Sequence, residues 1–275
     1  MRIIGTSNET YIYLNGIRPR EEVALGDGVI LMPASCRPTP DDIIAKCKSE
    51  IDIGVACVFL RSVSACFRIS ANTPQDLATM AWNSSWDAVL LGALLDCEVG
   101  FTFQSDVPPE NFPKAIDFHV TNYAFKGLNA GKVKKIGPSE HRWIATHYNA
   151  AKKLMDDDRY SSAVHSLSSY RWHPMPRAQL ALLWSGIEGL FSVDYELSFR
   201  LSLYIARFLS PRRGTRQKAI FDSVKNLYAV RSKAVHGGKL KNPHEAAKGT
   251  VKILRQLVVK CAERKGLPKT DDLAP

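Results

Sequence analysis

Residues 228–238, Tyr-Ala-Val-Arg-Ser-Lys-Ala-Val-His-Gly-Gly, close a helix that we predict to begin near Arg216. The apolar residues between positions 220 and 235 recur at steps of three and four, which places most of them on one helical face. Arg231 continues this stripe one turn after Tyr228. A guanidinium in line with a buried face is costly unless an anion or acceptor meets it. Arg231 is therefore expected to have a partner.

His236 lies in the last turn of the same helix, before a glycine pair that is a common C-terminal signal. The helix dipole favours an imidazolium there, and histidine is the side chain that most often changes charge near neutral pH. Arg231 and His236 thus form a candidate pair for reaction with a phosphate.

Five residues turn a helix by about 500°, so the side chains of Arg231 and His236 point about 140° apart. They meet only if the helix unwinds at Gly237 or a second chain supplies half of the pocket. The alternative is structural, with the arginine paired to a core carboxylate and the histidine bound to the terminal carbonyls.

The sequence around this pair resembles the Apea-like branch of the HEPN domains (higher eukaryotes and prokaryotes nucleotide-binding). Their signature is Arg-x(4–6)-His at the end of a long helix, followed by glycine. Residues 180–191, which carry Glu188 ahead of Leu-Phe, and residues 199–209 are similar to the same branch. The resemblance covers roughly residues 139–265.

The resemblance implies metal-independent RNA cleavage, in which the ribose 2′-hydroxyl attacks the adjacent phosphorus and a 2′,3′-cyclic phosphate remains. His236 would act as general acid or base, and Arg231 would stabilise the phosphorane-like charge. It also implies a homodimer through the C-terminal bundle, and a role as a toxin or anti-phage defence effector; no cofactor is expected. Two alternatives stay open: a non-cleaving RNA- or nucleotide-binding module, and a structural or regulatory interaction protein. The candidate auxiliary residues are Ser232, Glu188 and Tyr228.

Charge is divided unevenly along the chain. Residues 1–130 hold 10 Lys/Arg against 15 Asp/Glu, whereas residues 131–275 hold 27 against 12, so the total of +10 arises wholly in the C-terminal half. This asymmetry predicts a polyanion such as RNA as the partner of the second half; a solvated lysine-rich surface is the alternative. The cations expected to contact phosphates are Arg212, Arg213, Arg216, Lys218 and Lys233.

Residues 1–130 read as a small mixed domain of strands and helices, whose role is unknown and which is a candidate docking site for a partner protein. Its expected helices span residues 39–49, with Thr39 or Asp41 as cap, and residues 73–95. Trp82 and Trp86, four residues apart in the second helix, are interpreted as core. The expected strands are residues 10–16, 29–32, 55–60, 66–70 and 99–103.

A small, basic segment closed by Gly-Pro, residues 129–138, marks a boundary. Beyond it the sequence predicts an all-α bundle over residues 138–265, followed by a flexible tail over residues 266–275. The fold class is therefore α+β. The expected helices are residues 139–155, 159–170, 177–191, 195–210, 216–236 and 242–264.

The nearly all-apolar helix 177–191 should be central in this bundle. Glu188 lies inside it, and a lone buried carboxylate is costly. We expect it to pair with Arg231, with Arg200 or with a backbone group, either as a structural ion pair or to position Arg231 for chemistry.

The sequence contains no pattern typical of a metal site. His141 and His147 are six residues apart and lie on different helical faces, unlike the i, i+4 pair of a metal helix. The six cysteines form no CxxC pair and are typical of reduced core thiols. No apolar run reaches the length of a membrane span, and the first residues turn polar at once. We therefore expect a cytoplasmic protein without a membrane partner.

Overall fold

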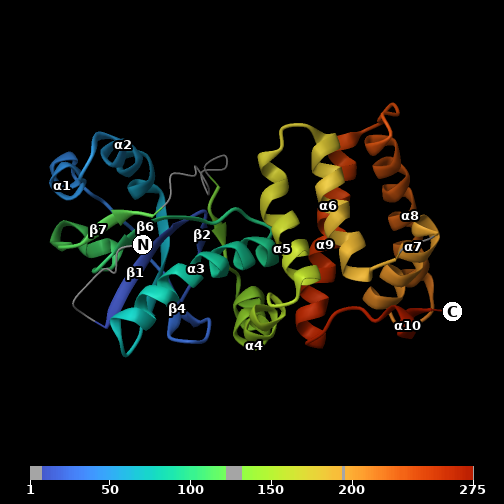
Figure 1. Ribbon diagram of the computed structural model, residues 1–275, viewed down its shortest axis with the longest axis horizontal. Coiled ribbons are helices and arrows are strands. Elements are labelled where there is room, and N and C mark those ends of the chain that lie inside the picture. Colours follow the sequence, from blue (N-terminus) through green and yellow to red (C-terminus); the bar gives the residue numbers. More distant parts are fainter. Residues whose placement is uncertain (1–7, 122–131, 194–195, 275) are drawn as a thin grey trace. The chain divides into compact units, whose positions relative to one another are not determined.

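The computed structural model describes residues 8–121, 132–193 and 196–274 (Figure 1). The chain forms two compact units, residues 1–149 and 150–275. Strands lie in the first unit and a helical bundle forms the second, which confirms the α+β class. Tyr195, the expected start of one helix, and residues 129–131 of the expected boundary segment lie outside the described residues.

The first unit is built on a six-stranded antiparallel sheet with the strand order β3-β4-β5-β1-β6-β7. A separate parallel pair joins β2 to β8. The strands are β1 (Glu9–Asn15), β2 (Ile17–Arg18), β3 (Val23–Ala24), β4 (Val29–Pro33), β5 (Val63–Ser70), β6 (Gly100–Ser105), β7 (Phe118–Val120) and β8 (Lys134–Lys135).

Both faces of this sheet are covered (Figure 1). Because successive side chains of a strand point to opposite faces, neighbouring residues of β1 contact different layers. Tyr13 packs in a core with Phe59 and Phe112, whereas Ile12 lies on the side of Ala81. The helices of this unit are α1 (Pro40–Lys46), α2 (Glu50–Phe59), η1 (Leu60–Ser62), α3 (Pro74–Leu95) and η2 (Pro109–Lys114).

The two helices expected in the first unit are confirmed, together with the cap of the first. Thr39 Oγ1 accepts the Asp42 N–H at 3.2 Å, and Asp42 Oδ2 accepts the Thr39 N–H at 2.8 Å. This reciprocal capping box satisfies donors that a helix start leaves free. Thr73 caps α3 through its hydroxyl, which accepts the Asp76 N–H at 3.1 Å.

The strand expected over residues 55–60 is wrong, because this segment lies in α2 and η1. Ser49 caps α2, and the buried residues Val55, Ala56 and Phe59 follow helical spacing, while Val58 is 48% exposed. A short apolar run does not distinguish a buried strand from one face of a helix.

The core interpretation of the two tryptophans is also wrong. Trp82 is 60% exposed and Trp86 47% exposed. The buried stripe of α3 runs through Leu77, Ala81 and Ser84 instead. Neither indole is therefore part of the core.

The second unit is a bundle in which α6 is central, as predicted: it contacts α5, α7, α8 and α9 (Figure 1). Leu183, Trp184, Ile187 and Leu190 of α6 are all buried. Five elements match predicted helices closely: α5 (Asp158–Ser169), α6 (Pro176–Phe191), α7 (Leu197–Leu209), α8 (Thr215–Val235) and α9 (Pro243–Arg264). The short helices η4 (Tyr170–Trp172) and α10 (Thr270–Leu273) were not predicted.

The division between the units falls inside α4 (Pro138–Leu154), whereas the sequence places it before this helix. Tyr148 of α4 donates to Asp87 Oδ1 of α3 at 2.6 Å, so this part of the helix belongs to the first unit. At the other end, the tail for which the sequence predicts flexibility forms α10. Arg207 Nη1 of α7 donates to the carbonyl oxygens of Leu273 at 2.7 Å and Ala274 at 2.6 Å.

Candidate functional site

The site is built on the second half of α8. Val224, Tyr228 and Ala234 form the buried stripe of this helix, and the Arg231 side chain, 20% exposed, lies in line with it. The helix ends at His236, whose N–H donates to the Ser232 carbonyl at 3.0 Å. Together these positions turn Arg231 toward the bundle and leave His236 at the helix end.

Glu188 of α6 is the partner of Arg231. Arg231 Nη2 donates to Glu188 Oε2 at 2.9 Å, and the two side chains are 20% and 22% exposed. Side chains lean toward the N-terminus of their own helix, and the start of α6 contacts the end of α8. On these oppositely directed helices the two groups therefore converge. Arg200, the other cation considered for Glu188, pairs with Glu196 instead.

Burial and the neighbouring positive charge shift the pKa of the Glu188 carboxyl in opposite directions. Desolvation raises the pKa of Glu188, and the Arg231 guanidinium lowers it without offsetting the rise. Desolvation also raises the pKa of Tyr228, again against the effect of Arg231. The pair thus lies in a partly desolvated environment, where electrostatic interactions are stronger than in water.

Two aromatic rings border the pair. The Tyr228 ring centroid lies 5.5 Å from Arg231 Cζ, a cation–π distance. Trp184 contacts Tyr228 edge-on, with 5.1 Å between ring centroids. The guanidinium is therefore held by a carboxylate on one side and packed against an aromatic ring on another.

Three buried polar atoms of this cluster have no hydrogen-bond partner among the described residues: Arg231 Nε, Glu188 Oε1 and Trp184 Nε1. Most buried polar groups in proteins are paired. A guanidinium offers five N–H donors, and the bond to Glu188 uses a single nitrogen, Nη2. These three atoms are buried, so the part of Arg231 open to a ligand is the exposed fraction of its side chain, 20%.

Arg177 is a further residue of this site that the sequence analysis missed. From the first turn of α6 its Nη1 donates to the carbonyls of Lys233 at 3.2 Å and Ala234 at 3.0 Å, and Nη2 donates to that of Gly238 at 2.6 Å. These bonds satisfy carbonyls that a helix end leaves free. A signal was present, because a cation in a first turn opposes the helix dipole and needs a partner elsewhere.

The structure leaves His236 apart from Arg231 within one chain. α8 is regular through Val235, and His236 departs from helical geometry with φ −93° and ψ 18°. His236 is exposed, whereas Arg231 is turned to Glu188. Gly237 follows with φ +76°, a conformation that favours glycine. The chain thus leaves helical geometry at His236 and Gly237, and among the described residues no hydrogen bond or ion pair joins His236 to Arg231.

The basic residues predicted to bind RNA fall into two groups. Lys233 is exposed next to the site, in the last turn of α8. The others are exposed at the opposite end of the helix, about 30 Å away at 1.5 Å per residue. The structure does not bring this second group to the site: Arg212, Arg213, Arg216 and Lys218.

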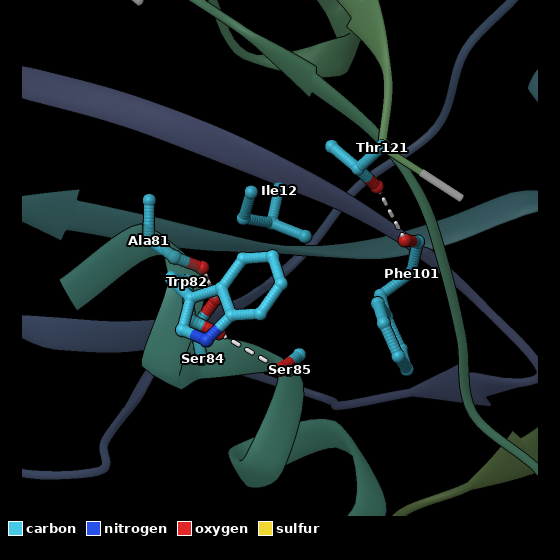
Figure 2. A pocket seen from close by; sticks show the side chains of 7 residues that line it. All are labelled: Ile12, Ala81, Trp82, Ser84, Ser85, Phe101 and Thr121. Atoms are coloured by element: carbon cyan, nitrogen blue, oxygen red, sulfur yellow. Dashed lines mark hydrogen bonds between the residues drawn. The ribbon is translucent and has the colours of Figure 1, made fainter. Parts of the chain in front are cut away.

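The first unit has an apolar cavity of about 150 Å³ between α3 and the sheet (Figure 2). Figure 2 shows the Trp82 indole over Ile12, with Phe101 and Thr121 on the opposite side. Thr121 Oγ1 donates to the Phe101 carbonyl at 2.9 Å. None of the seven described residues that line it is ionisable.

The described residues contain no group of three or more His, Cys, Asp or Glu side chains arranged to hold a metal ion. Within the same residues, no helix has both the length and the apolar character to span a membrane.

Comparison of the chain with protein-family models, with curated proteins and with solved structures found no match.

Proposed function

We propose that this chain is a HEPN-type ribonuclease that cleaves RNA without a metal ion, using Arg231 and His236. The observation that carries the proposal is the Arg231 guanidinium, which Glu188 holds in a partly desolvated environment through a bond to one of its nitrogens, Nη2. It lies on the helix that ends in exposed His236, in the order of the Arg-x4-His signature.

The reaction is a transesterification within the RNA strand. The ribose 2′-oxygen attacks the adjacent phosphorus and loses its proton to a base, and the bond from phosphorus to the 5′-oxygen breaks as that oxygen takes up a proton. The products are a 2′,3′-cyclic phosphate and a 5′-hydroxyl. His236 serves as the general acid or base, and Arg231 stabilises the charge on the phosphorane oxygens.

The other site residues support these two. Glu188 fixes the guanidinium, and Tyr228 packs under it. Arg177 donates to three carbonyls at the end of α8, on both sides of His236. These bonds fix the backbone that carries His236. Ser232 accepts the His236 N–H through its carbonyl, and its hydroxyl is a candidate hydrogen-bond donor to the substrate. Lys233 contributes positive charge beside the site.

The site is completed by a second copy of the chain in this proposal. Within one chain Arg231 and His236 face different directions, so a homodimer through the C-terminal unit is needed to line one cleft with both. The role is that of a cytoplasmic toxin or anti-phage effector, and the first unit is the docking site for a partner protein.

A second candidate function is a non-cleaving RNA- or nucleotide-binding module. The observation that favours it is the bond between Arg231 and Glu188, which satisfies the charge of the guanidinium without a substrate. Such a module binds RNA through the same basic residues and leaves the strand intact.

The test is incubation of the purified chain with total RNA in EDTA. We expect fragments, and we expect His236→Ala to reduce their rate of formation by about 10²–10⁴-fold, the usual cost of losing a general acid–base group. Arg231→Lys should also be poor, because lysine lacks the planar fork that holds two phosphate oxygens. His244→Ala, an exposed histidine at the start of α9, is the matched control and should cleave normally.

The outcomes separate the candidates. If the unmodified chain binds RNA but leaves it intact, the result supports the binding module. Cleavage that is undiminished in His236→Ala removes the site assignment, and the basic residues 212–218 would be the next place to look.

A further inference from the structure

A second cavity in the first unit, of about 230 Å³, is lined by four cations. Arg18 comes from β2, Arg37 precedes α1, Arg61 lies in η1 and Lys132 precedes β8. β2 pairs with β8, with Ile17 aligned to Lys134 and Arg18 to Lys135. This pairing brings Lys132, two residues before β8, to the same cavity as Arg18. Segments far apart in the sequence thus place positive charge around one hollow.

This concentration of cations is not explained by the composition of the unit. Residues 1–130 carry five more acidic than basic residues, yet three of their ten Lys/Arg line this cavity. None of the ten lining residues is acidic. Among the described residues, none of the four cations makes an ion pair with a carboxylate. Like charges that make no ion pair repel each other, and a bound anion relieves that repulsion.

The neutral groups of the cavity leave the cations as its main donors. Ser62 Oγ donates to the Phe59 carbonyl and Ser64 Oγ to that of Ile17, each at 2.7 Å. The Ser35 N–H donates to Glu110 Oε1 at 2.7 Å, so a carboxylate also lies at the rim of the cavity. Burial raises the pKa of the Cys36 thiol to about 12, so this side chain lines the cavity as a neutral group.

We propose that this cavity binds a small phosphate-bearing molecule through Arg18, Arg37, Arg61 and Lys132. Guanidinium groups pair with phosphate oxygens two at a time, and lysine adds a point charge. The volume is smaller than that of ordinary drug-sized pockets, roughly 300–1,000 Å³, which favours a phosphate or a phosphomonoester headgroup over a nucleic-acid strand. The site lies wholly in the first unit and does not rest on the proposed ribonuclease.

The experiment is isothermal titration calorimetry of the full chain with inorganic phosphate and with adenosine 5′-monophosphate, using sodium acetate as the non-phosphate anion. We expect saturable binding of at least one phosphate ligand, and no binding of acetate. Arg37→Gln and Arg61→Gln should each weaken binding about tenfold or more, the cost of a charge-assisted hydrogen bond. Arg20→Gln removes an exposed arginine of the same unit that does not line the cavity, and it should leave affinity unchanged.

The controls distinguish loss of binding from misfolding, and a small phosphate ligand from RNA. Arg61→Lys retains the charge and should recover part of the affinity, which a merely misfolded variant would not show. The proposal is overturned if neither phosphate ligand binds at tens of millimolar, or if Arg20→Gln weakens binding as much as the cavity variants. It is also overturned if a single-stranded oligoribonucleotide binds in an Arg61-dependent way while both small phosphates do not, since the cavity is then part of an RNA surface.

Discussion

At the scale of single residues, the pair of Glu188 and Arg231 decides the geometry of the candidate site. Glu188→Ala leaves a guanidinium without its partner. Breaking a fully buried pair costs about 3–5 kcal/mol. Both side chains here keep about a fifth of their exposure, so solvent screening reduces the effect, and we expect a loss of about 2 kcal/mol in the free energy of unfolding. Glu188→Gln should lose less, because one acceptor survives.

Urea denaturation measures this loss. The matched control is Glu196→Ala, which removes the carboxylate of an exposed pair with Arg200, where the Glu196 side chain is 66% exposed. Exposed pairs contribute about 0–1 kcal/mol, so its effect should be small. Equal stability of Glu188→Ala and the unmodified chain would show that the pair does not hold α6 to α8.

At the scale of elements, two glycines of α6 separate packing from helix propensity. A Cβ at Gly186 would lie 3.0 Å from Ser166 Cβ and 3.2 Å from Ala163 Cα of α5, whereas a Cβ at Gly189 would meet nothing within 4 Å. Gly186→Ala should therefore destabilise the bundle by about 1–3 kcal/mol through overpacking. Gly189→Ala should stabilise it by about 0.5–1 kcal/mol, since alanine is the better helix former. Thermal denaturation of both variants checks this contrast, and stabilisation by both would contradict the close approach of α5 and α6.

The helices of the second unit were predictable because each is long and carries apolar residues at steps of three and four. The segment 55–60 was not, since six apolar residues fit a strand as well as one face of a helix. Trp82 and Trp86 were misjudged for a related reason: residue type favours burial, but the face of α3 that packs on the sheet is set by the residues around them. Sequence periodicity predicts where helices and strands lie, whereas tertiary contacts determine which face of each element is buried.

The candidate site was predictable only in part. The stripe through Tyr228 required a partner for Arg231, but three partners fitted Glu188, and only the packing of α6 on α8 selected Arg231. The contact of Arg177 with the end of α8 joins residues more than fifty positions apart, so no local pattern contains it. The separation of residues 212–218 from His236 follows from the length of α8.

At the scale of the whole molecule, the proposed function requires two chains. We expect light scattering to show a species of twice the 30.6 kDa chain mass at about tens of micromolar, a permissive concentration for typical interfaces. If each site takes Arg231 from one chain and His236 from the other, then mixing Arg231→Lys with His236→Ala should restore cleavage that neither variant shows alone. A monomer at that concentration, or a mixture as inactive as its components, would contradict the composite site.

The central claim is that cleavage proceeds through the ribose 2′-hydroxyl without a metal ion. The most direct measurement uses an oligoribonucleotide that the chain cuts at a mapped position, in EDTA, compared with the same oligonucleotide carrying a single 2′-deoxy residue there. We expect the first to give a 2′,3′-cyclic phosphate and a 5′-hydroxyl, and the second to stay intact at that position. Cutting of the 2′-deoxy position, or products ending in a 5′-phosphate, would contradict the claim.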